Sequence, residues 1–133
     1  MVYYIYILSK RTFAMEEKNR IPLSSLIKEF KLETIYLPRE ADQIFVTAPE
    51  VDRPGLALSG FLDIFEESRI QLIGIAEYDY LSHMSAELRD ERVRAFVAKK
   101  PVVIMMTSGN PAPEELIKYC KEYEVPLLST EEL

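Results

Sequence analysis

The apolar residues in the second half of the chain fall into short blocks separated by amphipathic stretches. Residues 70–76 and 102–106 are apolar at almost every position, which is typical of strands buried on both faces of a parallel sheet. Residues 125–128 form a third block. Between the blocks, apolar residues recur every three or four positions, which is the spacing of a helix with one buried face. This alternation predicts a parallel sheet with right-handed crossover connections.

The helices of this half have clear boundaries in the sequence. Residues 77–84 predict a short helix. The next helix begins after Ser85, whose hydroxyl can cap it, and ends before Pro101, which cannot continue a helix. The last helix follows the prolines at positions 111 and 113.

The first half predicts shorter elements. Residues 23–30 place leucine, isoleucine and phenylalanine at i, i+3, i+4 and i+7, which predicts an amphipathic helix capped by Ser24 or Ser25. Residues 34–37 and 44–46 predict two short strands.

A further amphipathic stripe has apolar residues at positions 58, 61, 62 and 65 and predicts another helix. Gly60 lies inside it, although glycine is about 1 kcal/mol less favourable than alanine there. Together these elements predict one α/β domain, a small mostly parallel sheet flanked by helices.

A stiff corner is predicted just before this stripe. Pro54 fixes the φ angle required at position i+1 of a type II turn, and Gly55 can adopt the positive φ required at i+2. Arg53 precedes a proline and is therefore pushed toward an extended conformation. Asp52 and Arg53 could anchor a loop or bind a ligand phosphate. In the alternative interpretation, Asp52 accepts backbone hydrogen bonds within the turn.

Three loops follow predicted strands and could bind a ligand, because open parallel sheets bind ligands beyond the carboxyl ends of their strands. They are residues 74–77, 107–110 and 129–130. The middle loop is the best candidate, because small polar side chains and a glycine can offer hydroxyls and free amides to an anion. The same sequence also fits a plain strand-to-helix connection. The loop consists of Thr107, Ser108, Gly109 and Asn110.

The sequence gives no pattern for a catalytic residue or a metal site. His83 is the only histidine and lies on a helical stretch, where a surface or interface position is expected rather than a catalytic one. Cys120 is the only cysteine; it excludes an internal disulfide and is expected to be a small buried hydrophobe. One histidine and one cysteine far apart do not have the spacing of metal ligands.

Composition narrows the class of partner. The 133 residues fit one domain, and 16 basic against 22 acidic residues give a net charge of -6. This charge disfavours nucleic acid and anionic membranes as partners. The single cysteine fits a reducing compartment, so a cytoplasmic location is expected.

Residues 1–20 are interpreted as an N-terminal extension or an extra edge strand. Residues 2–8 form an apolar run rich in tyrosine and isoleucine, which is strand-like, too short to span a bilayer and a poor signal peptide. Three interpretations stay open. The run is an edge strand, a strand that binds a partner, or a stretch upstream of a natural start at Met15.

The segment 52–61, Asp-Arg-Pro-Gly-Leu-Ala-Leu-Ser-Gly-Phe, resembles the pattern Arg-Pro-Gly-Leu-x-Leu-x-Gly-Tyr/Phe of the N-terminal domain of HPr kinase/phosphorylase. Residues 69–74, 101–107 and 114–128 match the family's following strands and helix in order. The resemblance covers residues 21–133 and implies a single layered α/β domain.

More distantly, the corner resembles the Asp-Ser-Arg-x-x-x-Pro-Gly-x-Leu-Phe motif of the first domain of Mur ligases, which helps to bind a uridine nucleotide sugar. Here the motif is compressed and has no serine between the aspartate and the arginine.

The resemblance also implies a role. Members of the family carry a C-terminal domain whose P-loop uses ATP and Mg²⁺ to phosphorylate a serine of HPr, a phosphocarrier of the bacterial sugar phosphotransferase system. This domain can also remove the phosphate, which couples carbon supply to catabolite repression, and the assembly is typically a hexamer. A P-loop needs Gly-Lys-Ser/Thr, and this sequence contains none.

The expected function is therefore that of a regulatory or assembly domain, not catalytic by itself and without ATP or Mg²⁺ in this chain. It is expected to form a homo-oligomer and to meet HPr only through the missing kinase domain. As an alternative, the chain is a stand-alone sensor that binds a nucleotide sugar or sugar phosphate near Arg53 and residues 107–110.

Overall fold

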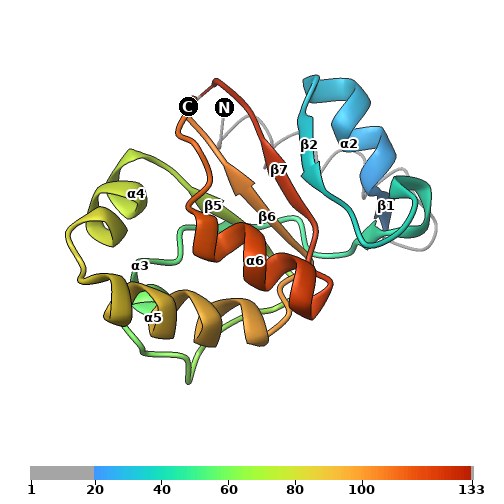
Figure 1. The fold of residues 1–133 in the computed structure, drawn as a ribbon. Helices are drawn as coiled ribbons and strands as arrows, with labels where there is room; N and C mark the ends of the chain where they lie inside the picture. Colours follow the sequence, from blue (N-terminus) through green and yellow to red (C-terminus); the bar gives the residue numbers. More distant parts are fainter. Residues whose placement is uncertain (1–19, 133) are drawn as a thin grey trace.

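A five-stranded mixed sheet forms the centre of the computed structural model, which describes residues 20–132 (Figure 1). The predictions for residues 2–8 and for Met15 lie outside these described residues. Three of the four pairings are parallel and the remaining one is antiparallel, so the prediction of a mostly parallel sheet flanked by helices is confirmed. In spatial order the strands are β2 (Glu33–Tyr36), β7 (Leu127–Ser129), β6 (Val103–Met106), β5 (Ile70–Ile73) and β4 (Val51–Asp52).

Helices pack against one face of this sheet, and a smaller unit covers the other. The first face carries α3 (Gly55–Leu58), α4 (Ile75–Ser82), α5 (Ala86–Ala98) and α6 (Glu114–Tyr123). The second face carries α2 (Leu23–Phe30), the 3₁₀ helix η1 (Ala41–Gln43), and a two-stranded sheet of β1 (Ile21–Pro22) and β3 (Phe45–Val46). Figure 1 shows α5 and α6 side by side, with α2 beyond β2. In the described part of the chain, no helix combines the length and apolarity needed to cross a membrane.

The strands β5 and β6 are buried on both faces, as their sequences predict. The prediction of a buried strand through residue 76 is wrong at its end, because β5 stops at Ile73 and residues 75 and 76 are exposed in α4. Ile73 and Met106 pack among the helices of the first face, and Leu72 and Met105 pack against the α2 side. Gln71 is the polar exception and is 1% exposed. Its side-chain amide donates to the carbonyl oxygens of residues 66 and 69 at 3.4 and 3.2 Å, so its burial leaves no donor unpaired.

The helix α5 begins as predicted, whereas α2 does not. The hydroxyl of Ser85 accepts a hydrogen bond from the amide three residues on, at 3.2 Å. Ser24 and Ser25 lie inside α2 and do not cap it. Instead, the amide of Leu23 donates to the carbonyl of Ile44 at 2.7 Å, so a neighbouring backbone segment supplies the acceptor that a capping side chain would provide.

The predicted type II turn at Pro54 and Gly55 is wrong. Pro54 has φ -85° and ψ 40°, and the amide of Gly55 donates to the carbonyl of Arg53 at 3.0 Å. These values describe an inverse γ-turn. Gly55 does not have a positive φ and starts α3 instead. The chain still turns tightly here, but the turn is made by the inverse γ-turn at Pro54 and the start of α3 rather than by a glycine with positive φ.

The predicted helix through residue 65 is also wrong, because α3 ends at Leu58. Gly60 has a φ of 102°, and a Cβ atom there would lie 2.9 Å from Nη1 of Arg92. The same Arg92 nitrogen donates to the carbonyl of Ser59. Glycine therefore serves here to end the helix and turn the chain under an arginine of α5.

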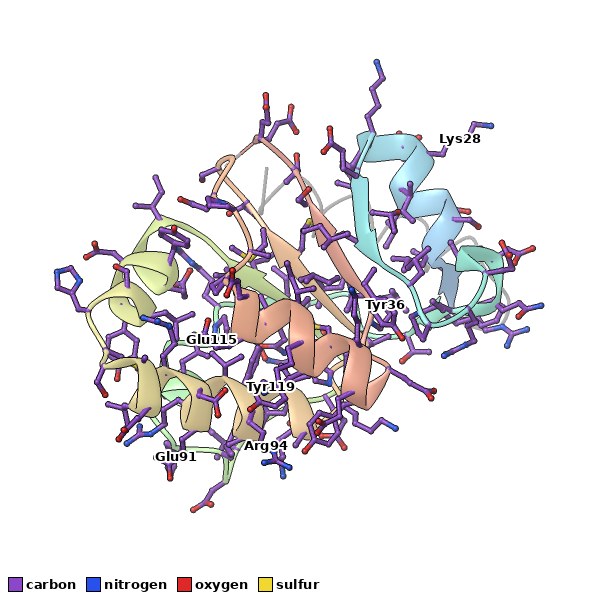
Figure 2. All side chains as sticks on the ribbon, in the orientation of Figure 1. Lys28, Tyr36, Glu91, Arg94, Glu115 and Tyr119 are labelled. Carbon is purple, nitrogen blue, oxygen red and sulfur yellow. The ribbon has the colours of Figure 1, made fainter. Side chains whose placement is uncertain are left out.

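A polar contact joins α5 to α6. The hydroxyl of Tyr119, which is buried, donates to the carboxylate of Asp90 at 2.8 Å. This hydrogen bond and burial raise the pKa of Tyr119 above its ordinary value. Figure 2 shows Arg94 beside Tyr119, with the guanidinium carbon 5.7 Å from the ring centroid. At the start of α6, Glu115 accepts from Nε of Arg89 at 2.7 Å.

Candidate functional site

The carboxyl edge of the parallel strands brings together two of the predicted site residues. Arg53 follows β4 and Thr107 follows β6, and the strand between them, β5, is followed by Gly74. A Cβ atom on Gly74 would lie 3.1 Å from Nη2 of Arg53 and 3.2 Å from Oγ1 of Thr107. Both side chains therefore flank the same backbone position, where the absence of a side chain leaves them room.

Glu77 organises this edge. Its Oε1 atom accepts from the amide of Gly74 at 2.8 Å, from Nη2 of Arg53 at 3.1 Å and from Nε of Arg53 at 3.4 Å. The Glu77 side chain is 9% exposed and the Arg53 side chain 54% exposed. The buried carboxylate thus fixes an arginine that still faces solvent. It also offsets the charge of that arginine, so a lone anion gains less there than at an unpaired guanidinium.

Asp52 has a different partner. Its Oδ1 atom accepts from Nη1 of Arg69 at 3.0 Å, and this hydrogen bond raises the pKa of Arg69 above its ordinary value. The alternative interpretation, in which Asp52 accepts from backbone amides of the turn, is therefore wrong. The ion pair ties the end of β4 to the residue before β5 and acts as a loop anchor.

The amides of the loop at residues 107–110 are engaged. Ser108 and Gly109 have φ angles of 62° and 69°. Their amides donate to the carbonyl oxygens of Glu132 at 2.8 Å and Thr130 at 3.2 Å. The expectation of free amides for an anion is therefore wrong, because the segment that follows β7 crosses this turn. Local sequence around position 108 carries no sign of that long-range contact.

Asn110 closes the same loop on itself. Its backbone amide and its Nδ2 atom donate to the carbonyl of Thr107 at 3.3 and 2.9 Å. Thr107 is 3% exposed. Of the four loop residues, Thr107 is therefore the one that approaches the Arg53 edge, and Asn110 has a structural hydrogen bond.

The predicted residues line two separate hollows. Gly109 and Asn110 border a hollow of about 470 Å³ beside Lys31 and Thr130. Asp52, Arg53 and Pro54 border one of about 200 Å³ on the α3 side. The four loop residues and the corner are thus not one site, and only Thr107 connects them through its contact with Gly74.

The remaining reactive side chains lie elsewhere. His83 is exposed, and its Nδ1 atom lies 3.7 Å from a carboxylate oxygen of Asp79; its predicted surface position is confirmed. Cys120 is buried as predicted, and burial raises the pKa of its thiol to about 12. It is therefore protonated at neutral pH and a poor nucleophile. Among residues 20–132, no three histidine, cysteine or acidic side chains are placed to hold a metal ion.

Gly74 and Glu77 delimit one of the three candidate loops, but neither was singled out as a site residue, although one signal was present. A glutamate three residues after the residue that precedes a helix has the spacing of a side chain that caps the helix start. The strand β4, with two residues, is too short for any periodic pattern.

Comparisons with known proteins agree on one family. The family model described as "HPr Serine kinase N terminus" matches residues 21–133. The HPr kinase/phosphorylase of Caldicellulosiruptor bescii is 36% identical over 112 residues, which cover 84% of this chain and 36% of that protein. That of Clostridium perfringens is 34% identical over 111 residues and that of Streptococcus uberis 32% over 108 residues. The chain spans 35 to 36% of the length of these curated relatives.

One solved structure is similar in fold. It contains the CBS and DRTGG domains of the regulatory region of Clostridium perfringens pyrophosphatase, complexed with the activator diadenosine tetraphosphate. The TM-score is 0.53 at 14% sequence identity, and the match covers 96% of this chain and 51% of that one. The likeness concerns the fold alone. The match to the family model over 21–133 shows that the chain belongs to the family of HPr serine kinase N-terminal domains.

Proposed function

We propose that this chain is the regulatory or assembly domain of an HPr kinase/phosphorylase acting in bacterial carbon catabolite regulation, not catalytic by itself. The observation that carries the proposal is the family match over residues 21–133 in a sequence that lacks Gly-Lys-Ser/Thr. A triphosphate needs a loop of free amides and a lysine, and the amides of Ser108 and Gly109 are already bonded. ATP, Mg²⁺ and HPr would bind to the kinase domain, in a cytoplasmic homo-oligomer.

The test has a catalytic and a regulatory part. The purified chain is incubated with ATP, Mg²⁺ and HPr, and separately with serine-phosphorylated HPr, beside the full-length Clostridium perfringens enzyme as a positive control. No phosphate transfer or release above the protein-free blank is expected, and turnover by this chain overturns the proposal.

In the regulatory part, residues 21–133 replace the matching region of that enzyme. The chimera is expected to recover the oligomeric state and effector response of the intact enzyme, and a deletion lacking the domain is expected to lose them. If the chimera behaves like the deletion, the regulatory role is refuted.

A second candidate function is a sensor for a nucleotide sugar or sugar phosphate. The observation that favours it is the approach of Arg53 and Thr107 to Gly74 at the carboxyl edge of the sheet, where such sheets bind ligands. UDP-sugars and sugar phosphates should raise the Tm of the chain, and Arg53→Met should abolish the shift. Arg69→Met is the matched control, because Arg69 also holds a carboxylate but precedes β5, whereas Gly74 follows that strand. A flat response across these metabolites removes this candidate.

A further inference from the structure

Three large apolar side chains stand exposed on the segment between β4 and β5. Leu56 is 61% exposed, Phe61 45% and Ile64 67%. Neighbouring side chains pack in the core in their place. Leu58 is fully buried, and Phe65 packs edge-to-face on a phenylalanine of α5, with ring centroids 5.6 Å apart. Exposed apolar side chains gathered in one place are typical of an interaction surface.

These three side chains border the hollow of about 200 Å³ on the α3 side. We call Leu56, Phe61, Ile64 and this hollow the Leu56 surface. Arg53 and Arg69 also border the hollow, but each already holds a carboxylate, Glu77 or Asp52. The surface therefore offers a partner an apolar recess without an unpaired cation.

The charge around the Leu56 surface is acidic. Residues 50–69 contain five carboxylates and two arginines, a net charge of -3 that is half of the net charge of the whole chain. Asp63, Glu66 and Glu67 are exposed and form no salt bridge within residues 20–132. Three exposed carboxylates without an ion pair thus lie on the same segment as the apolar side chains. Arg92 of α5 is a cation that reaches this segment from another element, and it donates to the carbonyl of Ser59.

This charge decides which occupant fits. A second copy of the chain would place two acidic rims against each other, and like charges across an interface oppose association. An anionic membrane is repelled for the same reason. A basic polypeptide instead gains both apolar burial and charge attraction. Its apolar side chains fill the recess and its cations face the carboxylates, as when an amphipathic helix docks in a groove.

We propose that the Leu56 surface binds a polypeptide segment whose apolar side chains are flanked by lysine or arginine. This inference goes beyond the proposed function, because it requires neither a kinase domain nor HPr.

Fluorescence anisotropy of the full chain tests the apolar part. The probe is a fluorescein-labelled amphipathic peptide of leucine and lysine, and the reference is the leucine and glutamate peptide of equal length. The chain should bind the first and not the second. Leu56→Ser with Ile64→Ser should weaken binding about tenfold or more. Ile75→Ser with Leu88→Ser, at two other exposed apolar positions, should leave the Kd within about twofold.

A second pair of variants tests the charge. Asp63→Lys with Glu66→Lys should weaken binding of the leucine and lysine peptide, and its salt dependence should fall. Glu29→Lys with Glu33→Lys makes the same change of charge on α2 and β2, at the opposite edge of the sheet from β4, and should leave binding intact. Thermal melting by circular dichroism confirms that each variant is folded.

Several results would overturn the proposal. They are the absence of binding up to about 1 mM protein, equal binding of the two peptides, or equal loss in both charge variants, which would show diffuse attraction to an acidic protein. Sedimentation of the chain alone adds another outcome, since self-association abolished by Leu56→Ser with Ile64→Ser assigns the surface to a second copy. None of these results bears on phosphate transfer, so this proposal and the proposed function fail separately.

Discussion

Replacing Glu77 by alanine removes the acceptor on which three hydrogen-bond donors converge. The amide of Gly74 lies 2.8 Å from Oε1, and two nitrogens of Arg53 lie at 3.1 and 3.4 Å. A buried amide left without an acceptor costs about 1–3 kcal/mol, and a partly exposed ion pair contributes roughly 0.2–1 kcal/mol. We expect Glu77→Ala to lower the free energy of unfolding by about 2–3 kcal/mol.

Two further substitutions separate these contributions. Glu77→Gln keeps an oxygen acceptor for the amide of Gly74 and should cost about 1 kcal/mol, because only the ionic part is lost. Arg53→Met removes the half-exposed pair and should cost less than about 1 kcal/mol. Glu91→Ala, an exposed site on α5 (Figure 2), is the control and should stay within about 0.5 kcal/mol.

Urea denaturation followed by far-UV circular dichroism measures these differences, and thermal melting should show a fall in Tm of several degrees for each kilocalorie per mole. The reasoning is refuted if Arg53→Met costs as much as Glu77→Ala, because the ion pair would then carry the effect. It is also refuted if Glu77→Ala costs less than about 0.5 kcal/mol, because the amide of Gly74 would then be satisfied by water.

Other positions give further expectations. Gly60→Ala should destabilise by about 1–2 kcal/mol in chemical denaturation because of its positive φ, whereas Gly55→Ala, with open space and a helical position, should be neutral or stabilising. Tyr119→Phe should destabilise the chain in urea denaturation by removing its hydrogen bond to Asp90. It should have little further effect once Asp90→Ala has removed the acceptor, in a double-mutant cycle. The raised pKa of the Cys120 thiol predicts a contribution to stability that is complete below about pH 8.5 and is lost as the pH rises toward 12. The stability curve of Cys120→Val should lack this loss, and iodoacetamide should label Cys120 only on unfolding.

The parallel core of the sheet was predictable from the sequence because its apolar pattern is strong. The strands β5 and β6 are apolar on both faces, and such runs have few alternatives to a central parallel strand. The helix start at Ser85 followed from a local hydrogen bond that the residue type itself predicts. Where one element determines its own structure, sequence and structure agree.

Two of the errors share a physical cause, which is contact with residues distant in the chain. The helix at α3 stops because Gly60 turns beneath Arg92, and the amides of Ser108 and Gly109 are bonded by the segment after β7. In both cases the local sequence pattern favours the predicted structure, but a tertiary contact stabilises a different one. Arg53 reached its predicted edge, and its partner Glu77 was recognisable only after the helix start at Gly74 was known.

The burial of both faces of β5 has a consequence for errors of strand register during folding. In a sheet with one face in solvent, a register shift of one residue moves the apolar side chains of the strand from the core to the solvent, and this exposure destabilises the shifted strand. A β5 strand shifted by one residue would still place apolar side chains on both buried faces of the sheet, so the shift exposes little apolar surface to water. Gln71 opposes the shift, because a shift of one residue would turn its polar side chain toward the apolar residues that pack on the α2 side of the sheet. One polar side chain thereby favours the native register of an otherwise apolar strand.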